Sequence, residues 1–536
     1  MEVLPFKMIK GEVVGEGAYG KVYVARDSRR SPETSSSDTY VIKRNIVEKE
    51  VDWAANLREP DILLRLRGHP NIVRLERVIY GRPFESGRMS PTRDNYKDDK
   101  LHFVLELGDM DLREFIQHPI LEKRITYKNI KPLVLDILLG LEYMHHNHII
   151  HRDIKPGNVL LFSADSVPRA KLCDFGLSKF YTKQEPQTPR MVTAWYRAPE
   201  IAMGALNYDY KVDVWAVGCV IYEMIVGSPL IVSRDDNQKV LEQILAALPE
   251  RLPPKETRKL KEMFKVRLPR GKKKGFIKVL FPENTREEFR EQCGSPELFA
   301  DMLKSALEFY PVHRPTISEL LDHAFFDDSR EIIDGIREKW LLRGEYTCFG
   351  EKEKRITILD CPERQWAICT AFYFYNKNNE VRIEWYKPRI LFQAIDLFDR
   401  YLLYKVDPSV PALEKYERGD FSPREEIEMC FVACVYLSIK YFATLFTPPS
   451  YLSMYEHLFR KENSEEFVRI FEKELLEKVF QYRIYRPTVF EYADIVGDEL
   501  SSKDIMQLLV AYGKCETREE IELGELYREL TQFKRS

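Results

Sequence analysis

The sequence lacks long hydrophobic runs and an excess of charge of either sign. No apolar stretch approaches the ~18 residues of a membrane span, and the N-terminus lacks the basic stretch and apolar core of a secretory signal. The 536 residues include 82 basic and 85 acidic side chains, a net charge of −3. Binders of nucleic acid or anionic membranes normally carry a basic excess. We therefore expect no nucleic acid and no membrane among the partners.

Cysteines are few and show no pairing pattern. The nine cysteines are thinly spread and include no C-x-x-C pair. Free thiols at this density fit a reducing compartment, so we expect a soluble intracellular protein. Single hydrophobic cores stop growing at about 250–300 residues, so this length predicts two to four domains.

The hydrophobic pattern changes along the chain. Up to about residue 328, short β-branched runs precede longer helical patterns, which predicts a small sheet followed by a helical lobe. From about residue 355 onward, apolar residues recur at the three- and four-residue spacing of buried helix faces. The charged segment 329–354 between them is predicted to be a linker with some helical content.

Three glycines, Gly15, Gly17 and Gly20, lie between two strand-like runs. Glycine permits tight turns and a close approach of the backbone to phosphates. The same spacing matches a dinucleotide-binding fingerprint, but that motif requires a helix directly afterwards, whereas residues 21–25 continue as a strand. The pattern favours a glycine flap over nucleotide phosphates between two antiparallel strands.

Four further motifs follow in order: a lysine at a strand end, an H-R-D-x-K-x-x-N run, a D-F-G triplet and a W-Y-R-A-P-E run. Phosphoryl transfer needs oxygen ligands for a hard cation, fixed positive charge for the phosphates and a carboxylate at the nucleophile. The motifs contain residues of these chemical types, namely Lys43, Asp153, Lys155, Asn158 and Asp174.

With these motifs in this order, residues 1–328 resemble a eukaryotic-type protein kinase. The resemblance implies an α+β bilobal fold, with a β-rich N-lobe at about 1–107 and a helical C-lobe at about 108–328. It also implies ATP and Mg²⁺ as cofactors. Asn158 and Asp174 would then be the metal ligands.

The resemblance assigns a role to each of the remaining motif residues. Asp153 would orient the substrate hydroxyl, Lys155 would lie near the transferred phosphate, and Lys43 would hold the α- and β-phosphates. The position of Lys155, two residues after Asp153, is typical of serine/threonine kinases. Two scaffold roles are also implied, namely a pair between Glu200 and Arg314 and a brace of the catalytic loop by Asp213.

Within the kinases, residues 101–112 and 191–197 are similar to the hinge and substrate loop of cyclin-dependent kinases. This implies a preference for Ser/Thr followed by Pro, with Leu105 as gatekeeper and a tighter adenine pocket under Val41. The implied ATP-binding residues are Val14, Gly15, Gly17, Gly20, Val22, Val41, Lys43, Glu59, Leu105, Glu106, Leu107, Gly108, Asp111 and Leu160.

The resemblance also implies an activating phosphorylation site at Thr188. A phosphate there needs cationic partners, which the family positions supply as Arg58, Arg152 and Lys179. Because Pro189 follows, we expect a proline-directed kinase to accept this site and the protein to activate itself between molecules.

Two positions depart from the family pattern. Tyr19 matches an inhibitory phosphosite, but Ala18 replaces the neighbouring inhibitory threonine, so only half of that switch is retained. Pro60 directly follows Glu59, the expected ion-pair partner of Lys43. Proline inside a helix costs ~3 kcal/mol, so the sequence predicts that Glu59 lies at a kink or near a helix start, with a less secure pair.

The C-terminal helices resemble a single all-α cyclin box at 355–500, followed by a tail at 501–536. The family's kinase-contacting lysine would be Lys440, and its partner in a later helix would be Glu472 or Glu474. The segments that carry this resemblance are 391–402, 434–441 and 471–488.

The whole chain is similar to the kinase–cyclin fusions of large DNA viruses, which implies the host cytoplasm or nucleus as its location. It is expected to transfer the γ-phosphate of ATP to Ser/Thr-Pro sites of protein substrates under activation by its own cyclin-like domain. Tethering gives effective concentrations of about millimolar, so docking in cis is favoured over a dimer in trans. The alternative is a cyclin-like module that recruits or activates a separate host kinase, with the attached kinase domain secondary.

Overall fold

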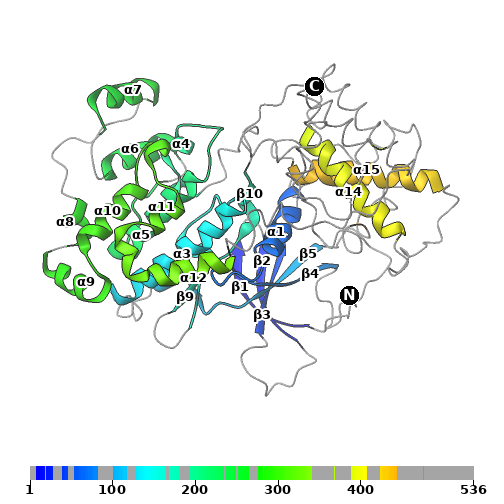
Figure 1. Cartoon of the computed structure of the whole chain (residues 1–536), viewed down its shortest axis with the longest axis horizontal. Coiled ribbons are helices and arrows are strands. Elements are labelled where there is room, and N and C mark those ends of the chain that lie inside the picture. Colours follow the sequence, from blue (N-terminus) through cyan, green and yellow to red (C-terminus); the bar gives the residue numbers. More distant parts are fainter. Residues whose placement is uncertain are drawn as a thin grey trace. The chain divides into compact units, whose positions relative to one another are not determined.

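The residues described by the computed structural model are 8–17, 20–27, 39–45, 53–81, 100–117, 127–163, 168–181, 193–233, 236–248, 252–264, 276–281, 283–340, 367, 388–406, 423–442 and 475 (Figure 1). The chain forms two compact units. The first comprises Met1–Arg65, Glu76–Val104 and Gly344–Ser536, and the second comprises Leu66–Leu75 and Leu105–Arg343. Segments from both ends of the chain therefore belong to the first unit.

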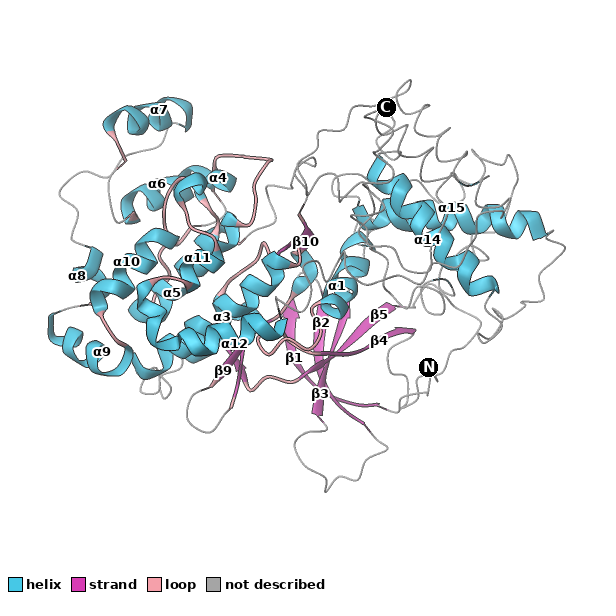
Figure 2. Cartoon of the chain, in the orientation of Figure 1, coloured by secondary structure: helices cyan, strands magenta, loops and turns pink. Residues whose placement is uncertain are grey.

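A five-stranded sheet forms the N-terminal part of the chain (Figure 2). Residues on β2 alternate between buried and half-buried, as expected for a strand with one face on a core. Ala25, Ile42 and Val104 pack together as that core. The strands, in the sheet order β1-β2-β3-β5-β4, are β1 (Met8–Gly17), β2 (Gly20–Asp27), β3 (Thr39–Asn45), β5 (Lys100–Glu106) and β4 (Leu75–Gly81).

Three helices complete the described part of the first unit: α1 (Trp53–Arg65), α14 (Pro388–Val406) and α15 (Pro423–Phe442). The segments expected to be helical around 391–402 and 434–441 are helical. α14 packs against α15 through Phe398 and Phe431, whose ring centroids are 5.4 Å apart. The Arg389 guanidinium lies 4.1 Å from the centre of the Phe442 ring. α15 also packs against α1.

Pro60 lies in the middle of α1 and not in its first turn. The expectation that Glu59 lies near a helix start is therefore wrong, because the helix begins at Trp53. Pro60 and the residues on either side of it are all buried. Tertiary contacts on both sides of this turn offset the backbone hydrogen bond that proline cannot make.

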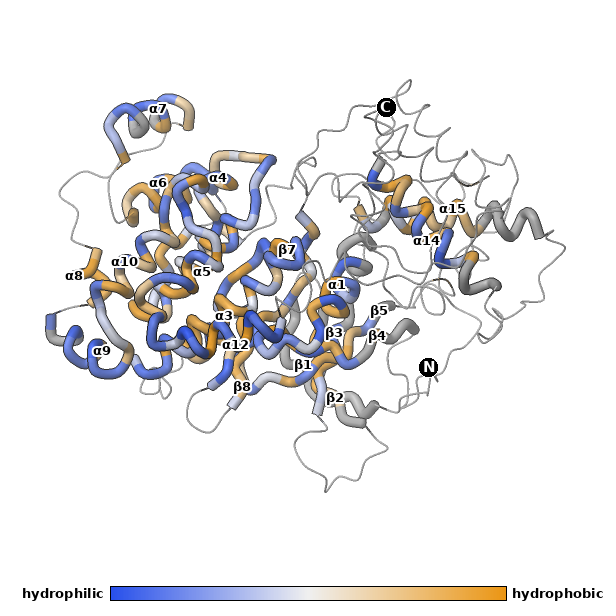
Figure 3. The backbone as a smooth tube through the Cα atoms, viewed as in Figure 1, coloured by the Kyte–Doolittle hydropathy of each residue, from blue (hydrophilic) through white to orange (hydrophobic). Residues whose placement is uncertain are grey.

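The second unit is mainly helical, and its long central helices α3 and α5 carry extended hydrophobic stretches (Figure 3). α3 approaches the loop after α1 so closely that a Cβ at Gly140 would lie 2.9 Å from the Asn71 carbonyl oxygen. The helices are α2 (Leu112–Gln117), α3 (Tyr127–His146), α4 (Pro199–Ala202), α5 (Lys211–Val226), α6 (Asn237–Ala247), α7 (Pro254–Phe264), α8 (Phe276–Leu280), α9 (Arg286–Cys293), α10 (Pro296–Ala306), α11 (Ile317–Leu321) and α12 (Arg330–Trp340). The short strands are β6 (Met110–Asp111), β7 (Ile149–Ile150), β8 (Val159–Phe162), β9 (Arg169–Leu172) and β10 (Lys179–Phe180).

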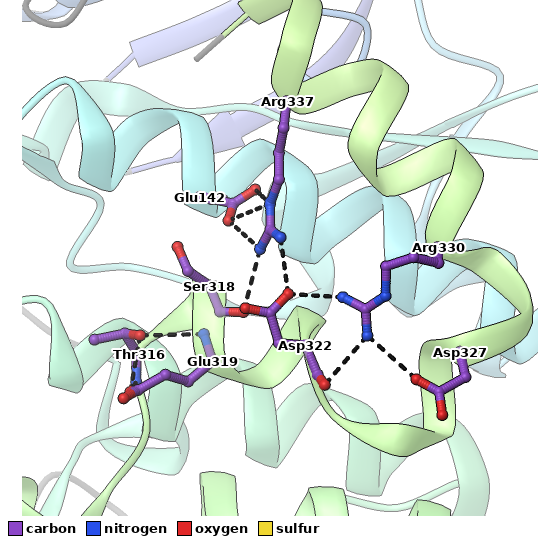
Figure 4. Close-up of polar contacts among 8 residues, drawn as sticks. All are labelled: Glu142, Thr316, Ser318, Glu319, Asp322, Asp327, Arg330 and Arg337. Atoms are coloured by element: carbon purple, nitrogen blue, oxygen red, sulfur yellow. Dashed lines mark hydrogen bonds and ion pairs between the residues drawn. The ribbon is translucent and has the colours of Figure 1, made fainter. Parts of the chain in front are cut away.

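α12 occupies the first part of the predicted linker and packs onto α3. Its Arg337 bonds both carboxylate oxygens of Glu142 and also pairs with Asp322 (Figure 4). Trp340 packs edge-on against His69 and Tyr143, at centroid distances of 5.5 and 5.9 Å. The helical lobe therefore extends to Trp340, and 341–354 lie outside the described residues.

The loop after α1 is shaped to receive Trp340. Gly68 has φ 95, a left-handed conformation that side chains rarely adopt, and a Cβ there would lie 3.2 Å from the indole. Burial lowers the pKa of His69 to about 3, so a neutral imidazole stacks on Tyr143 at 4.6 Å. In the part of the chain that the structure describes, no helix is long and apolar enough to cross a membrane.

Candidate active site

The glycine motif closes a hairpin between β1 and β2. Gly17 pairs with Gly20 and Gly15 pairs with Val22, while β2 continues as a strand to Asp27. The tip residues 18 and 19, which include the predicted phosphosite Tyr19, lie outside the described residues. The expected hairpin of two antiparallel strands is confirmed, and the helix that a dinucleotide-binding motif requires does not follow.

Predicted nucleotide contacts share one face of this sheet. Lys43 lies opposite Val22, and Val41 lies opposite Val24. Opposed residues of an antiparallel pair project to the same side, as do alternate residues of one strand. Val22 and Val24 are only half-buried, whereas the other face packs into the core. The sheet therefore presents Lys43 on its more open face.

Lys43 and Glu59 form an ion pair across the first unit. The Lys43 ammonium donates to Glu59 Oε1 at 2.7 Å, and the two side chains are 10% and 2% exposed. Because both partners are buried, removal of either side chain would leave the other as an uncompensated buried charge. The pair forms despite Pro60.

Asp153 lies at the centre of a polar cluster in the second unit. Lys155 Nζ and Asn158 Nδ2 donate to Asp153 Oδ2 at 2.5 and 3.0 Å. Thr193 Oγ1 donates to Asp153 Oδ1 at 2.8 Å. The structure thus brings together three predicted residues and one that sequence reasoning did not single out. The only signal for Thr193 was its place in the substrate-loop segment 191–197.

Asp213 supports the loop that carries Asp153. It accepts hydrogen bonds from the backbone amides of His151 and Arg152, at 2.8 and 2.9 Å, and from His145 Nε2 at 3.0 Å. Burial alone would raise the pKa of Asp213, but these hydrogen bonds and the neighbouring imidazoles hold it below its ordinary value. Arg152 has φ 67, a strained conformation that needs such external support. The predicted bracing role is confirmed.

Asn158 and Asp174 lie at the ends of paired strands. Asn158 directly precedes β8 and Asp174 closely follows β9, and Val159 pairs with Leu172. The Cys173 amide donates to the Asn158 carbonyl at 3.0 Å. Asp174 has φ 61, which turns the chain sharply into Phe175–Leu177. Carboxylate and amide oxygens are ligands that Mg²⁺ prefers, so this donor set fits the ion.

The predicted hinge has its own polar support. Glu106 Oε1 accepts from the Arg74 amide at 2.7 Å and from Lys171 Nζ at 2.8 Å. The Glu106 amide donates to the Arg74 carbonyl at 3.1 Å. The Glu106 side chain therefore orders the hinge, and its neighbour Leu107 is 37% exposed.

The other predicted contacts of this region also lie in the second unit. A Cβ at Gly108 would approach Leu160 Cβ at 3.1 Å, so these two residues pack together. Asp111 Oδ1 accepts from the Glu114 amide at 2.7 Å and so ties down the first turn of α2. This cap is a structural role that the sequence pattern did not indicate.

Cations predicted to receive a phosphate are buried. Arg152 donates through Nε to the Leu177 carbonyl at 2.6 Å, and its buried Nη1 has no hydrogen-bond partner among the described residues. Lys179 is buried in the same unit, and Arg58 is buried in the first unit. Thr188 lies outside the described residues.

One of the predicted cyclin-box contacts lies on a described helix. Lys440 lies on α15, and neither its side chain nor any part of Glu472 is among the described features. The predicted scaffold pair is confirmed, because Arg314 forms a two-pronged bridge to Glu200 at 2.9 and 3.2 Å.

The protein kinase domain family matches residues 8–326. With the kinase motifs in the arrangement described above, this chain belongs to the protein kinase family. The match ends before the predicted cyclin-like box at 355–500.

Individual relatives place the domain among cyclin-dependent-kinase-like kinases. Cyclin-dependent kinase 10 of Homo sapiens is 37% identical over 221 residues, covering 41% of this chain and 54% of that protein. Mitogen-activated protein kinase homolog NTF6 of Nicotiana tabacum is 31% identical over 322 residues, covering 60% and 77%. The chain therefore spans about half the length of its cyclin-dependent kinase 10 relatives. The CAK complex of Chaetomium thermophilum with ATP-gamma-S aligns at TM-score 0.45 and 27% identity, covering 60% of this chain and 91% of that one.

Proposed function

We propose that this protein is a cyclin-dependent-kinase-type serine/threonine kinase that transfers the γ-phosphate of ATP to Ser/Thr-Pro sites. The observation that carries the proposal is the cluster in which Lys155, Asn158 and Thr193 all donate to the Asp153 carboxylate. Similarity to cyclin-dependent and mitogen-activated protein kinases supports the same class.

Each group has a defined task in this reaction. Asp153, held at both oxygens, accepts and orients the proton of the substrate hydroxyl, while Lys155 offsets negative charge on the transferred phosphoryl group. Lys43, fixed by Glu59, holds the non-transferred phosphates. Bound Mg²⁺ would supply positive charge against the phosphate oxygens, and Asn158 and Asp174 would hold it.

The buried Nη1 of Arg152, which has no hydrogen-bond partner among the described residues, supports a second element of the proposal. A buried guanidinium nitrogen without an acceptor is costly, and a phosphate would satisfy it. We take phosphorylated Thr188 as its ligand in the active enzyme. Since Pro189 follows Thr188, the enzyme's own specificity would accept the site.

We further propose that the C-terminal region acts as a built-in cyclin-like activator. α15 packs against α1, the helix that carries Glu59, and both belong to the first unit. An activator that contacts α1 can control the Lys43–Glu59 pair and with it the placement of the ATP phosphates. Tethering keeps such an interface occupied without a separate cyclin supply.

Kinase assays on matched peptides test the catalytic proposal. Full-length protein should phosphorylate Ser-Pro and Thr-Pro peptides at least tenfold faster than Ser-Ala or Tyr-Pro peptides. Asp174→Asn and Asp153→Asn should each abolish this activity. Undiminished activity of Asp174→Asn would mean that a co-purified kinase is responsible.

A chain that ends at Arg343 tests the activator proposal. This end point keeps Arg337 and Trp340, which pack within the second unit. Low activity that a separately produced 344–536 fragment restores would support the proposal. If the shortened, folded chain equals the full chain, the region is not an activator. If 344–536 stimulates a separate host kinase instead, it is a recruiting module.

A further inference from the structure

Tyr441 on α15 and Asp61 on α1 form a buried hydrogen bond within the first unit, although 380 positions separate them in the sequence. The Tyr441 hydroxyl donates to Asp61 Oδ2 at 3.0 Å. Tyr441 is 1% exposed and Asp61 is fully buried. The other carboxylate oxygen, Oδ1, accepts from Arg65 Nε at 3.2 Å. Asp61 is therefore bonded from its own helix on one oxygen and from α15 on the other.

Asp61 and Glu59 project from opposite sides of α1. Two residues along an α-helix correspond to a rotation of about 200°. Glu59 uses its side to pair with Lys43 of the sheet, and Asp61 uses its side to bond Tyr441. Buried polar contacts on two sides of one turn thus fix the rotation of α1 about its axis.

Pro60 lies between these two contacts. Proline has no backbone N–H, so the helix ladder is weakest at the turn that carries Glu59. A turn with a missing backbone hydrogen bond depends more on its side-chain contacts for its orientation. Loss of the Tyr441–Asp61 hydrogen bond should therefore change the orientation of Glu59.

The chemistry of the pair also makes the hydroxyl hard to replace. Burial, together with the negative charge of Asp61, raises the pKa of Tyr441 well above its ordinary value, so the phenol stays protonated and acts as the donor. A buried carboxylate that loses a donor is strongly destabilised. α1 would shift to restore hydration or another partner for Asp61.

We infer that Tyr441 is a positioning residue for the Lys43–Glu59 pair: its hydroxyl, acting through Asp61, sets the rotation of α1 and thereby couples the C-terminal region to ATP binding. This inference rests on the proposed activator function. The coupling is assigned to the hydroxyl oxygen of Tyr441.

Steady-state kinetics of full-length variants test this assignment. Tyr441→Phe removes only the hydroxyl and should lower kcat/KM for ATP about tenfold, mostly through a higher KM for ATP. The KM for a Ser-Pro peptide should stay unchanged. Tyr401→Phe, at another fully buried tyrosine of the same unit, is the matched control and should leave the KM for ATP unchanged. If the Tyr441 hydroxyl had only a structural role, Tyr441→Phe would lower the thermal midpoint without a selective rise in the KM for ATP.

A double-mutant cycle tests the route through Asp61. Asp61→Leu keeps a similar side-chain size but removes both acceptor oxygens, so it should cause at least the loss seen in Tyr441→Phe. Adding Tyr441→Phe to Asp61→Leu should cause no further loss, because the contact is already absent. A further loss, or Asp61→Leu with wild-type kinetics, would overturn the inference. Asp61→Leu alone decides the matter if Tyr441→Phe does not fold.

Tyr441→Arg separates the inference from the proposed function. It places a cation beside Asp61 and Arg65 and disrupts the packing of α15 against α1. Full activity of this variant would refute activation by the C-terminal region. An inactive Tyr441→Arg together with a kinetically normal Tyr441→Phe would overturn only the role of the hydroxyl. Lower activity of both Tyr441→Arg and Tyr441→Phe, with the rise in KM confined to ATP, would support both the activator proposal and the role of the hydroxyl.

Discussion

Arg337 of α12 and Glu142 of α3 form a two-pronged ion pair, with Nε and Nη2 of the arginine 3.0 and 2.7 Å from Glu142 Oε1. The two side chains are 19% and 5% exposed. The pair joins a segment outside the matched kinase family region to the central helix of the lobe. It shows that α12 is part of the folded second unit and not a free tether.

Arg337→Ala should therefore destabilise the protein. Removal of the guanidinium leaves Glu142 buried without this partner, a loss of about 3 kcal/mol. Arg330→Ala on the same helix is the control, because its partners Asp322 and Asp327 are 52% and 70% exposed, and such pairs contribute less than about 1 kcal/mol. Urea unfolding monitored by tryptophan fluorescence measures both. Equal losses would contradict a special role for the Glu142 pair.

Thr193→Val should lower kcat with little effect on the KM for ATP. The change keeps the shape of the side chain but removes the donor to Asp153 Oδ1. A hydrogen bond to a charged group is worth about 1.5–3 kcal/mol, so a loss of about tenfold or more is expected. Thr193→Ser keeps the hydroxyl and should remain within about twofold of wild type. Wild-type kcat in the valine variant would show that Asp153 is adequately held by Lys155 and Asn158.

Pro60→Ala should stabilise α1. Alanine restores the missing N–H and removes the ring clash, and mid-helix proline costs about 3 kcal/mol in the absence of compensation. We expect a higher thermal midpoint and slower amide exchange in α1. A lower midpoint would indicate that packing of the buried proline ring outweighs the backbone cost.

Asp213→Asn should change the pH dependence of stability. The pKa of Asp213 is below its ordinary value of 3.8 in the folded protein, so its carboxylate stabilises the fold above about pH 4. This contribution is lost as the pH falls through the lowered folded-state pKa. The stability difference between wild type and Asp213→Asn should therefore be full at pH 7 and shrink below about pH 4. Urea midpoints from pH 3 to 8 measure it, and a constant difference would contradict this linkage.

The catalytic motifs could be read from the sequence because each is local. Asp153, Lys155 and Asn158 lie within one short loop, and the Cys173–Asn158 hydrogen bond brings Asp174 next to it. Strand continuation after Gly20 was enough to exclude a dinucleotide-binding helix. The position of Glu59 could not be predicted from Pro60, because a helix rule based on one missing hydrogen bond does not include the buried contacts around the proline.

Local spacing in the sequence was enough to single out the candidate catalytic side chains, because spacing within a loop decides which groups can meet. Three contacts became visible only in the folded chain: Glu59 reaches Lys43 across Pro60, Arg337 ties the predicted linker to Glu142, and Tyr441 bonds Asp61. Each of these contacts joins distant segments through buried charge or a buried hydrogen bond. Such contacts are selected by the packing of whole helices, which no local pattern specifies.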